Sequence, residues 1–316
     1  MMDKLLRVFY TDGPRRRLRS GWRLGIYVLL LMLFTLPFTL MAGLLMLRLN
    51  MDPASTPALL VGQIAFAIAS TLATWFAVRF LDQRPWVSIG LTGPRSRASR
   101  EFGLGLSLGV GQFALILLVA LALGWARILA CRACAWTWDQ ALRELVYALA
   151  LWTAVAWSEE LILRGYVFQT LAEGIGTFWA WVAQALIFAI LHAANPGWGP
   201  RPALGLFLAG LYLGQGYLAT RRLWLPIGLH WGWNWAEAAL GFPVSGLEQT
   251  PMRLFDLAVS GPEAWTGGTF GPEGGYLGVL AILVGMMVLH QWAARQARTN
   301  PPRDPKQDPD PRIEPR

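Results

Sequence analysis

Long apolar runs dominate this 316-residue sequence and determine the solvent in which it folds. Runs of about 18 or more apolar residues indicate membrane-spanning helices, and the chain has several. Hydrophobic residues make up 55% of the sequence and charged residues 15%, whereas soluble domains carry about 25% charged residues. Because a lipid-exposed backbone must satisfy its own hydrogen bonds, we predict an all-α, polytopic membrane helix bundle.

We predict eight transmembrane helices, with both termini on the same side of the membrane. Segments on the side of the termini carry 21 Lys and Arg residues, and those on the other side carry 6. Since cytoplasmic loops are enriched in these residues, both termini are predicted to be cytoplasmic. The predicted spans are 22–48, 57–81, 102–126, 142–171, 177–195, 202–220, 225–241 and 273–294.

The net charge of +8 is explained by the Lys and Arg residues that set the orientation of the spans in the membrane. Because the sequence also contains no nucleic-acid-binding motif, no nucleic-acid partner is predicted. Arginine outnumbers lysine 25 to 2, which is typical of a GC-rich bacterial genome. We therefore expect a multi-pass protein of the inner (plasma) membrane, surrounded by membrane lipids.

The predicted spans divide the chain into four parts. Residues 1–141 hold a basic segment and three spans, and residues 142–241 hold four spans with buried polar residues. Residues 242–298 hold an outer loop and the last span, and residues 299–316, with 6 prolines, are predicted to be a disordered cytoplasmic tail. Cys131 and Cys134 lie in an outer loop, where a disulfide and two free thiols both remain open.

The fourth span contains Glu159, Glu160 and Arg164 within an otherwise apolar run. Charged residues inside a membrane span are costly and usually functional. Residues four apart share a helix face, whereas neighbours point about 100° apart. Glu160 and Arg164 are therefore predicted to form an ion pair, which leaves Glu159 free for another role.

Two of the three histidines also lie within apolar spans. His192 falls in the fifth span and His230 in the seventh, where Asn234 shares its helix face. The amide of Asn234 could orient the imidazole or help stabilise an oxyanion. His290 lies near the inner end of the last span, where an interfacial histidine needs no special role.

A glutamate, two histidines and an asparagine in one cavity suit hydrolysis. The glutamate could deprotonate a water molecule and a histidine could protonate the leaving amine. A set of two histidines and one glutamate is also a ligand pattern of catalytic zinc. A zinc ion held by Glu159, His192 and His230 is thus one alternative to metal-free hydrolysis, and no other cofactor is indicated. A second alternative is that the polar cluster is purely structural. The proton-coupled transporter alternative lacks an inverted repeat of broken helices.

Three motifs resemble the signatures of the CPBP family, which comprises type II CAAX prenyl proteases and bacteriocin-processing or self-immunity (Abi) proteins. The resemblance covers about residues 145–240 and makes 142–241 the catalytic core. Gly271–Gly275 also resembles a stretch found in bacterial members. The three motifs are Glu159-Glu160-x-x-x-Arg164, Phe188-x-x-x-His192 and His230-x-x-x-Asn234.

The resemblance implies an all-helical intramembrane endopeptidase, glutamate-dependent or metal-dependent, with a cavity open toward the cytoplasm. Glu159 would activate water with the help of His192, while His230 and Asn234 would form the oxyanion site. Glu160 and Arg164 would support these residues. The expected substrate is a membrane-associated protein or peptide. A non-catalytic scaffold or bacteriocin self-immunity protein is the alternative that the family also contains.

Overall fold

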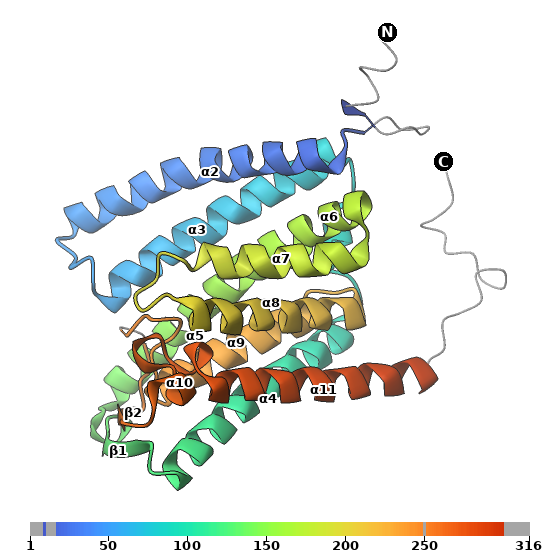
Figure 1. Ribbon diagram of the computed structural model, residues 1–316. Helices are drawn as coiled ribbons and strands as arrows, with labels where there is room; N and C mark the ends of the chain where they lie inside the picture. Colours follow the sequence, from blue (N-terminus) through green and yellow to red (C-terminus); the bar gives the residue numbers. More distant parts are fainter. Residues whose placement is uncertain (1–8, 11–16, 249–250, 300–316) are drawn as a thin grey trace.

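The structure, a computed structural model, describes residues 9–10, 17–248 and 251–299, and these form a helix bundle (Figure 1). The predicted all-α polytopic fold is confirmed. The long helices are α2 (Ser20–Arg48), α3 (Thr56–Phe76), α4 (Arg95–Ala122), α5 (Trp138–Glu160), α6 (Phe168–Ile175), α7 (Thr177–Leu191), α8 (Pro200–Thr220), α9 (Trp224–Ala239) and α11 (Tyr276–Thr299). The short elements are the π-helices η1 (Ala77–Leu81) and η4 (Leu161–Val167), the 3-10 helices η2 (Trp86–Ile89), η3 (Ala133–Ala135), η5 (Gly268–Phe270) and η6 (Pro272–Gly274), the helix α10 (Glu263–Thr266), and the strands β1 (Ala126–Cys131) and β2 (Phe255–Val259).

Six helical segments of the described chain are long and apolar enough to cross a membrane. Two further helices, α7 with 15 residues and α9 with 16, are shorter, so the count of eight spans stays a prediction. α2 begins and α11 ends at the same end of the bundle (Figure 1), while their cytoplasmic location stays a prediction. The six segments are Ser20–Arg48, Thr56–Leu81, Arg95–Ala122, Trp138–Ile175, Pro200–Thr220 and Tyr276–Thr299.

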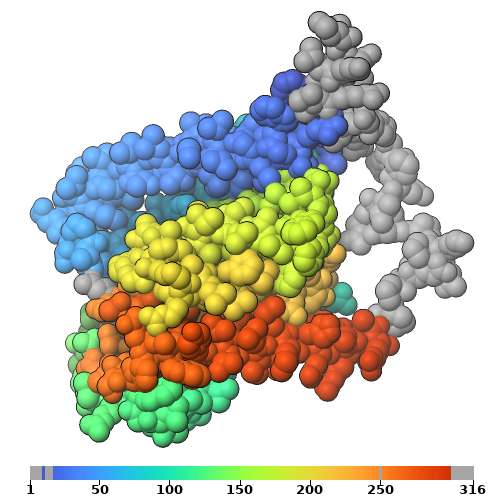
Figure 2. All heavy atoms as spheres, viewed as in Figure 1, coloured from blue at the N-terminus to red at the C-terminus, as the bar shows by residue number. Residues whose placement is uncertain are grey.

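The outer surface of the bundle is apolar, as expected for a protein surrounded by lipid. Only 11% of the most apolar part of α2 is buried. Figure 2 shows α2 along one edge of the molecule, with α7, α8 and α11 filling the face below it. Exposed leucines such as Leu33 and Leu44, each 67% accessible, would contact acyl chains instead of water.

The backbones of α9 and α4 approach each other closely at glycine positions on both helices. A Cβ atom added to Gly105 would lie 2.2 Å from the carbonyl oxygen of Leu225, and one added to Gly232 would lie 2.5 Å from that of Leu106. Small residues let helix backbones approach this closely in lipid. The contact fixes the position of α9, which carries His230 and Asn234.

Replacing Gly109 with alanine should destabilise the protein by about 1–3 kcal/mol, because the added methyl group has no space. Its carbon would lie 2.5 Å from the backbone nitrogen of Trp233. Gly111→Ala on the same helix is the control, since no atom lies within 4 Å of its added carbon. The melting temperatures in detergent should fall for the first variant alone, and equal values would contradict this packing.

A two-stranded sheet covers the end of the bundle opposite the start of α2 (Figure 1). β1 pairs with β2 in antiparallel register, and Cys131, the last residue of β1, forms a disulfide with Cys134. The sequence prediction contained no strand here and extended the third span to residue 126. That prediction was wrong because Gly124, with φ +69°, ends the helix before β1 begins.

Other boundaries also differ from the prediction. α4 begins at Arg95 instead of residue 102, because its first two turns are polar and the apolar pattern starts later. The predicted disordered tail lies outside the described residues, apart from Thr299 at the end of α11.

Candidate active site

The two adjacent glutamates lie where α5 passes into the π-helix η4. All seven residues of η4 are buried, and π-helical turns often occur at functional sites. The Arg164 guanidinium donates from Nη1 to Oε1 of Glu160 at 2.8 Å and from Nη2 to the Gly210 carbonyl at 3.0 Å. The side chains of Glu160 and Arg164 are fully buried. The ion pair expected from their spacing is therefore present.

His230 lies between the two glutamates. Its Nδ1 is 2.9 Å from Oε1 of Glu160, and its Nε2 is 3.8 Å from Oε2 of Glu159. Glu160 thus accepts hydrogen bonds from both His230 and Arg164, which fixes the imidazole ring. Glu159 remains on the cavity side, with 25% of its side chain exposed.

His192 lies just after the end of α7. The predicted fifth span ran to residue 195, but the helix ends at Leu191, because the chain turns at Pro196 and Gly197, which has a φ of +73°. The Nδ1–H of His192 donates to the Phe188 carbonyl at 2.9 Å, which leaves Nε2 free as an acceptor. The Phe188 ring lies 4.8 Å from the His192 ring and 6.1 Å from the His230 ring.

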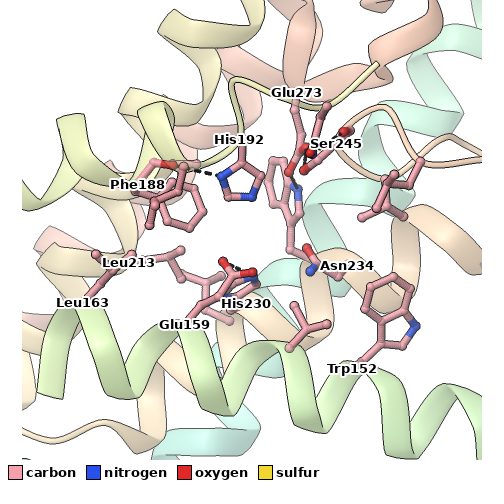
Figure 3. A pocket seen from close by; sticks show the side chains of 18 of the residues that line it. Trp152, Glu159, Leu163, Phe188, His192, Leu213, His230, Asn234, Ser245 and Glu273 are labelled. Atoms are coloured by element: carbon pink, nitrogen blue, oxygen red, sulfur yellow. Dashed lines mark hydrogen bonds and ion pairs between the residues drawn. The ribbon is translucent and has the colours of Figure 1, made fainter. Parts of the chain in front are cut away.

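Glu159, His192, His230 and Asn234 line one cavity of about 370 Å³. Figure 3 shows Glu159 on α5 facing His192 across this cavity, with Asn234 to one side. Glu160 and Arg164 do not line it and lie behind its wall. The structure therefore brings four of the six predicted site residues to the cavity, and the other two contact His230 or each other behind its wall.

Loops from the end of the bundle that carries the sheet also line the cavity. Asn195, Ser245 and Leu247 belong to these loops, and the Asn195 amide donates to the Ser245 carbonyl at 2.9 Å. The backbone N–H of Gly246 donates to the Phe270 carbonyl at 2.8 Å, which joins two of the loops. The opening toward the cytoplasm implied by the resemblance stays a prediction.

The geometry does not fit the alternative of a zinc site. Within the described residues, no group of three His, Cys, Asp or Glu side chains is arranged to hold an ion. Of the two histidines, His230 alone is paired with Glu159, at 3.8 Å. No reaction step is therefore derived through a metal.

Two further buried acidic residues lie near the site. Glu237, seven residues after His230, was expected from the sequence to share its helix face and line the cavity, but it does not line it. Sequence reasoning gave Glu273 no role beyond its place in the Gly271–Gly275 stretch. Glu273, 4% exposed, lines the cavity and accepts a hydrogen bond from Nε1 of Trp233 at 2.9 Å. Glu237 is fully buried on α9, and neither of its oxygens has a hydrogen-bond partner among the described residues. In the sequence, each of these glutamates is a single charge in an apolar or glycine-rich segment, and such an isolated charge could have indicated a buried functional residue.

The fold and the site define a polytopic helical membrane protein with a hydrolase-like polar cavity. Residues 141–236 match the family model described as type II CAAX prenyl endopeptidase Rce1-like. This match supports CPBP family membership for the matched segment and an intramembrane CAAX-type protease in general, which implies a peptide or protein substrate. No curated protein and no solved structure matches the chain.

Proposed function

We propose that this protein is an intramembrane endopeptidase in which Glu159 activates the attacking water. The observation that carries this proposal is the position of the Glu159 carboxylate, 3.8 Å from Nε2 of His230 in a cavity also lined by His192 and Asn234. The Glu159 side chain is 25% exposed and lines the cavity, which gives a water molecule access to the carboxylate from the cavity side. A general base must lie within reach of the proton that it takes.

Each site residue has a role in this reaction. Glu159 takes a proton from water while the water oxygen bonds to the carbonyl carbon of the peptide. Asn234 and the Nε2–H of a protonated His230 stabilise the oxyanion of the tetrahedral intermediate. Nε2 of His192 orients the water, accepts the proton that Glu159 has taken, and passes it to the leaving nitrogen as the C–N bond breaks, so that an acid and an amine are released and Glu159 is again a carboxylate.

Glu160 and Arg164 act through His230. Glu160 holds Nδ1 of the imidazole, and Arg164 compensates the buried charge of Glu160. A ring fixed from its Nδ1 side presents Nε2 to the cavity in one orientation, which such a mechanism requires.

The proposed substrate is a membrane-associated protein or peptide that reaches the cavity within a bacterial inner membrane. The cavity wall is largely apolar and aromatic, with Phe66, Trp152 and Trp233 among its members. Such a wall suits an apolar segment leaving lipid. No nucleic-acid partner is proposed.

A metal-free mechanism predicts that a chelator leaves hydrolysis unchanged, within about twofold. The purified protein should hold less than one equivalent of zinc by elemental analysis. Stoichiometric zinc in the wild type that is lost in both His192→Ala and His230→Ala would overturn the metal-free mechanism.

The comparison of His192→Ala with His290→Ala tests the proposed function. Purified proteins in lipid nanodiscs are incubated with membrane peptides, and new termini are identified by mass spectrometry. His192→Ala should lower the rate roughly 10²- to 10⁴-fold, whereas His290→Ala, on the exposed side of α11, should leave it unchanged. Equal rates for the two variants would favour a non-catalytic scaffold or self-immunity protein.

A further inference from the structure

Glu273 lies in the active-site cavity although it comes from outside the segment that matches the family model. It belongs to η6, directly before α11, and is 37 residues beyond the last matched residue, 236. Its side chain is 4% exposed and lines the cavity together with Glu159 and His192. Figure 3 shows Glu273 beyond His192 on the side away from Glu159.

Both carboxylate oxygens of Glu273 accept a hydrogen bond. Oε1 accepts from Nε1 of Trp233 at 2.9 Å, and Oε2 accepts from the hydroxyl of Ser245. Trp233 directly precedes Asn234 on α9, and its ring packs edge-on against Phe113 of α4 at 4.6 Å. Glu273 therefore holds the part of α9 that carries the proposed oxyanion residue.

The second contact connects Glu273 to the loop after His192. Ser245 accepts a hydrogen bond at its carbonyl oxygen from the amide of Asn195, whose backbone N–H in turn bonds to the His192 carbonyl at 3.0 Å. One carboxylate thus joins, directly or through one residue, the segments that hold His192 and Asn234. Buried side-chain networks of this kind fix the geometry of the groups that they connect.

The backbone around Glu273 has little freedom to move. A Cβ atom added to Gly205 of α8 would lie 1.8 Å from the carbonyl oxygen of Glu273, and one added to Gly278 of α11 would lie 2.1 Å from that of Pro272. Gly271 has a φ of +92°, which side-chain-bearing residues rarely adopt. Gly205 and Gly278 therefore allow this segment to approach α8 and α11 closely, and Gly271 allows the backbone conformation that precedes it.

We infer that Glu273 is a positioning residue of the active site, acting through Trp233 and Ser245, and that η6 is part of the catalytic unit. Both oxygens already accept hydrogen bonds from protein groups, which assigns Glu273 to holding the cavity wall instead of reacting with the substrate. This inference rests on the proposed endopeptidase function. Supporting residues of this kind typically contribute about 10- to 100-fold to activity.

Alanine and glutamine variants at position 273 distinguish the loss of the hydrogen-bond acceptors from the loss of the negative charge. Glu273→Ala removes both acceptors and should lower kcat about 10- to 100-fold with little change in KM. Glu273→Gln keeps the shape and an acceptor for Trp233, so it should recover activity to within a few-fold of the wild type. Glu263, an exposed glutamate at the start of α10 that pairs with Arg201, provides the matched control, and Glu263→Ala should leave kcat unchanged.

Trp233→Phe removes the indole N–H and so tests whether Glu273 influences kcat through its hydrogen bond with Trp233. Because the two residues act as one unit, Glu273→Ala combined with Trp233→Phe should be no slower than Glu273→Ala alone. Additive losses would overturn the inference, even if Glu273→Ala lowers the stability of the fold. A wild-type kcat in Glu273→Ala, or a Glu273→Gln variant as slow as Glu273→Ala, would also overturn it.

A spectroscopic signal tests the contact without depending on activity. The indole N–H resonance of Trp233 in ¹⁵N-tryptophan-labelled protein, assigned by its absence in Trp233→Phe, should move in Glu273→Ala and stay in place in Glu263→Ala. An unmoved signal overturns the positioning role. If the wild type hydrolyses no peptide while the signal moves, the proposed function has failed and the inferred contact stands.

Discussion

Replacing Glu159 with glutamine should lower kcat for peptide-bond hydrolysis roughly 10²- to 10⁴-fold while the protein still folds. Glutamine has nearly the same shape as glutamate but cannot accept a proton from water. The Glu159 side chain makes no hydrogen bond that the fold depends on, since its Oε2 has no hydrogen-bond partner among the described residues and lies 3.8 Å from Nε2 of His230. The effect should therefore fall on the reaction and leave the melting temperature within a few degrees of the wild type.

Glu144→Gln is the matched control for this substitution. Glu144 lies on the same helix, outside the cavity, and accepts a hydrogen bond from the Met252 backbone at 3.0 Å that a glutamine side chain can also accept. Its kcat should equal that of the wild type. Substantial hydrolysis by Glu159→Gln would remove Glu159 from the role of general base.

The second large effect is a loss of protein stability when Arg164 is replaced. Arg164→Met should destabilise the protein by about 3–5 kcal/mol, because it leaves the buried Glu160 carboxylate without its cation. It also removes the hydrogen bond from Nη2 to the Gly210 carbonyl, which connects η4 to α8. Equilibrium unfolding in mixed micelles measures this loss.

Two further variants identify the cause of that loss. Adding Glu160→Leu to Arg164→Met removes both charges, so the double variant should be more stable than Arg164→Met alone. Arg201→Met breaks an exposed ion pair with Glu263 and should cost less than about 1 kcal/mol. A loss at Arg164 as small as that at Arg201 would contradict the burial of the Glu160–Arg164 pair.

Helical periodicity predicted the features that depend on a single helix. The apolar runs located the helices, and the spacing of four residues predicted the Glu160–Arg164 pair, which forms at 2.8 Å. The same spacing placed His230 and Asn234 on one face, and both line the cavity. These outcomes follow because residues four apart are neighbours on any α-helix.

Features that depend on several segments were not predictable in this way. Sequence spacing showed Glu160 beside Arg164 but not its second contact with His230, which is 70 residues away. The loops have no periodic pattern, so the β1–β2 sheet and the placement of Glu273 in the cavity depend on tertiary contacts alone. The π-helical turns of η4 likewise have no pattern that distinguishes them from the α-helix before them.

Proteolysis within the membrane is tested most directly by comparing peptide termini in membranes that contain equal amounts of the wild type or of Glu159→Gln. New termini should be found with the wild type alone, within or beside apolar segments of membrane proteins or peptides. The sequences at these termini would identify the substrate. Identical sets of termini in the two membranes would contradict proteolysis by this protein and favour a scaffold or self-immunity protein.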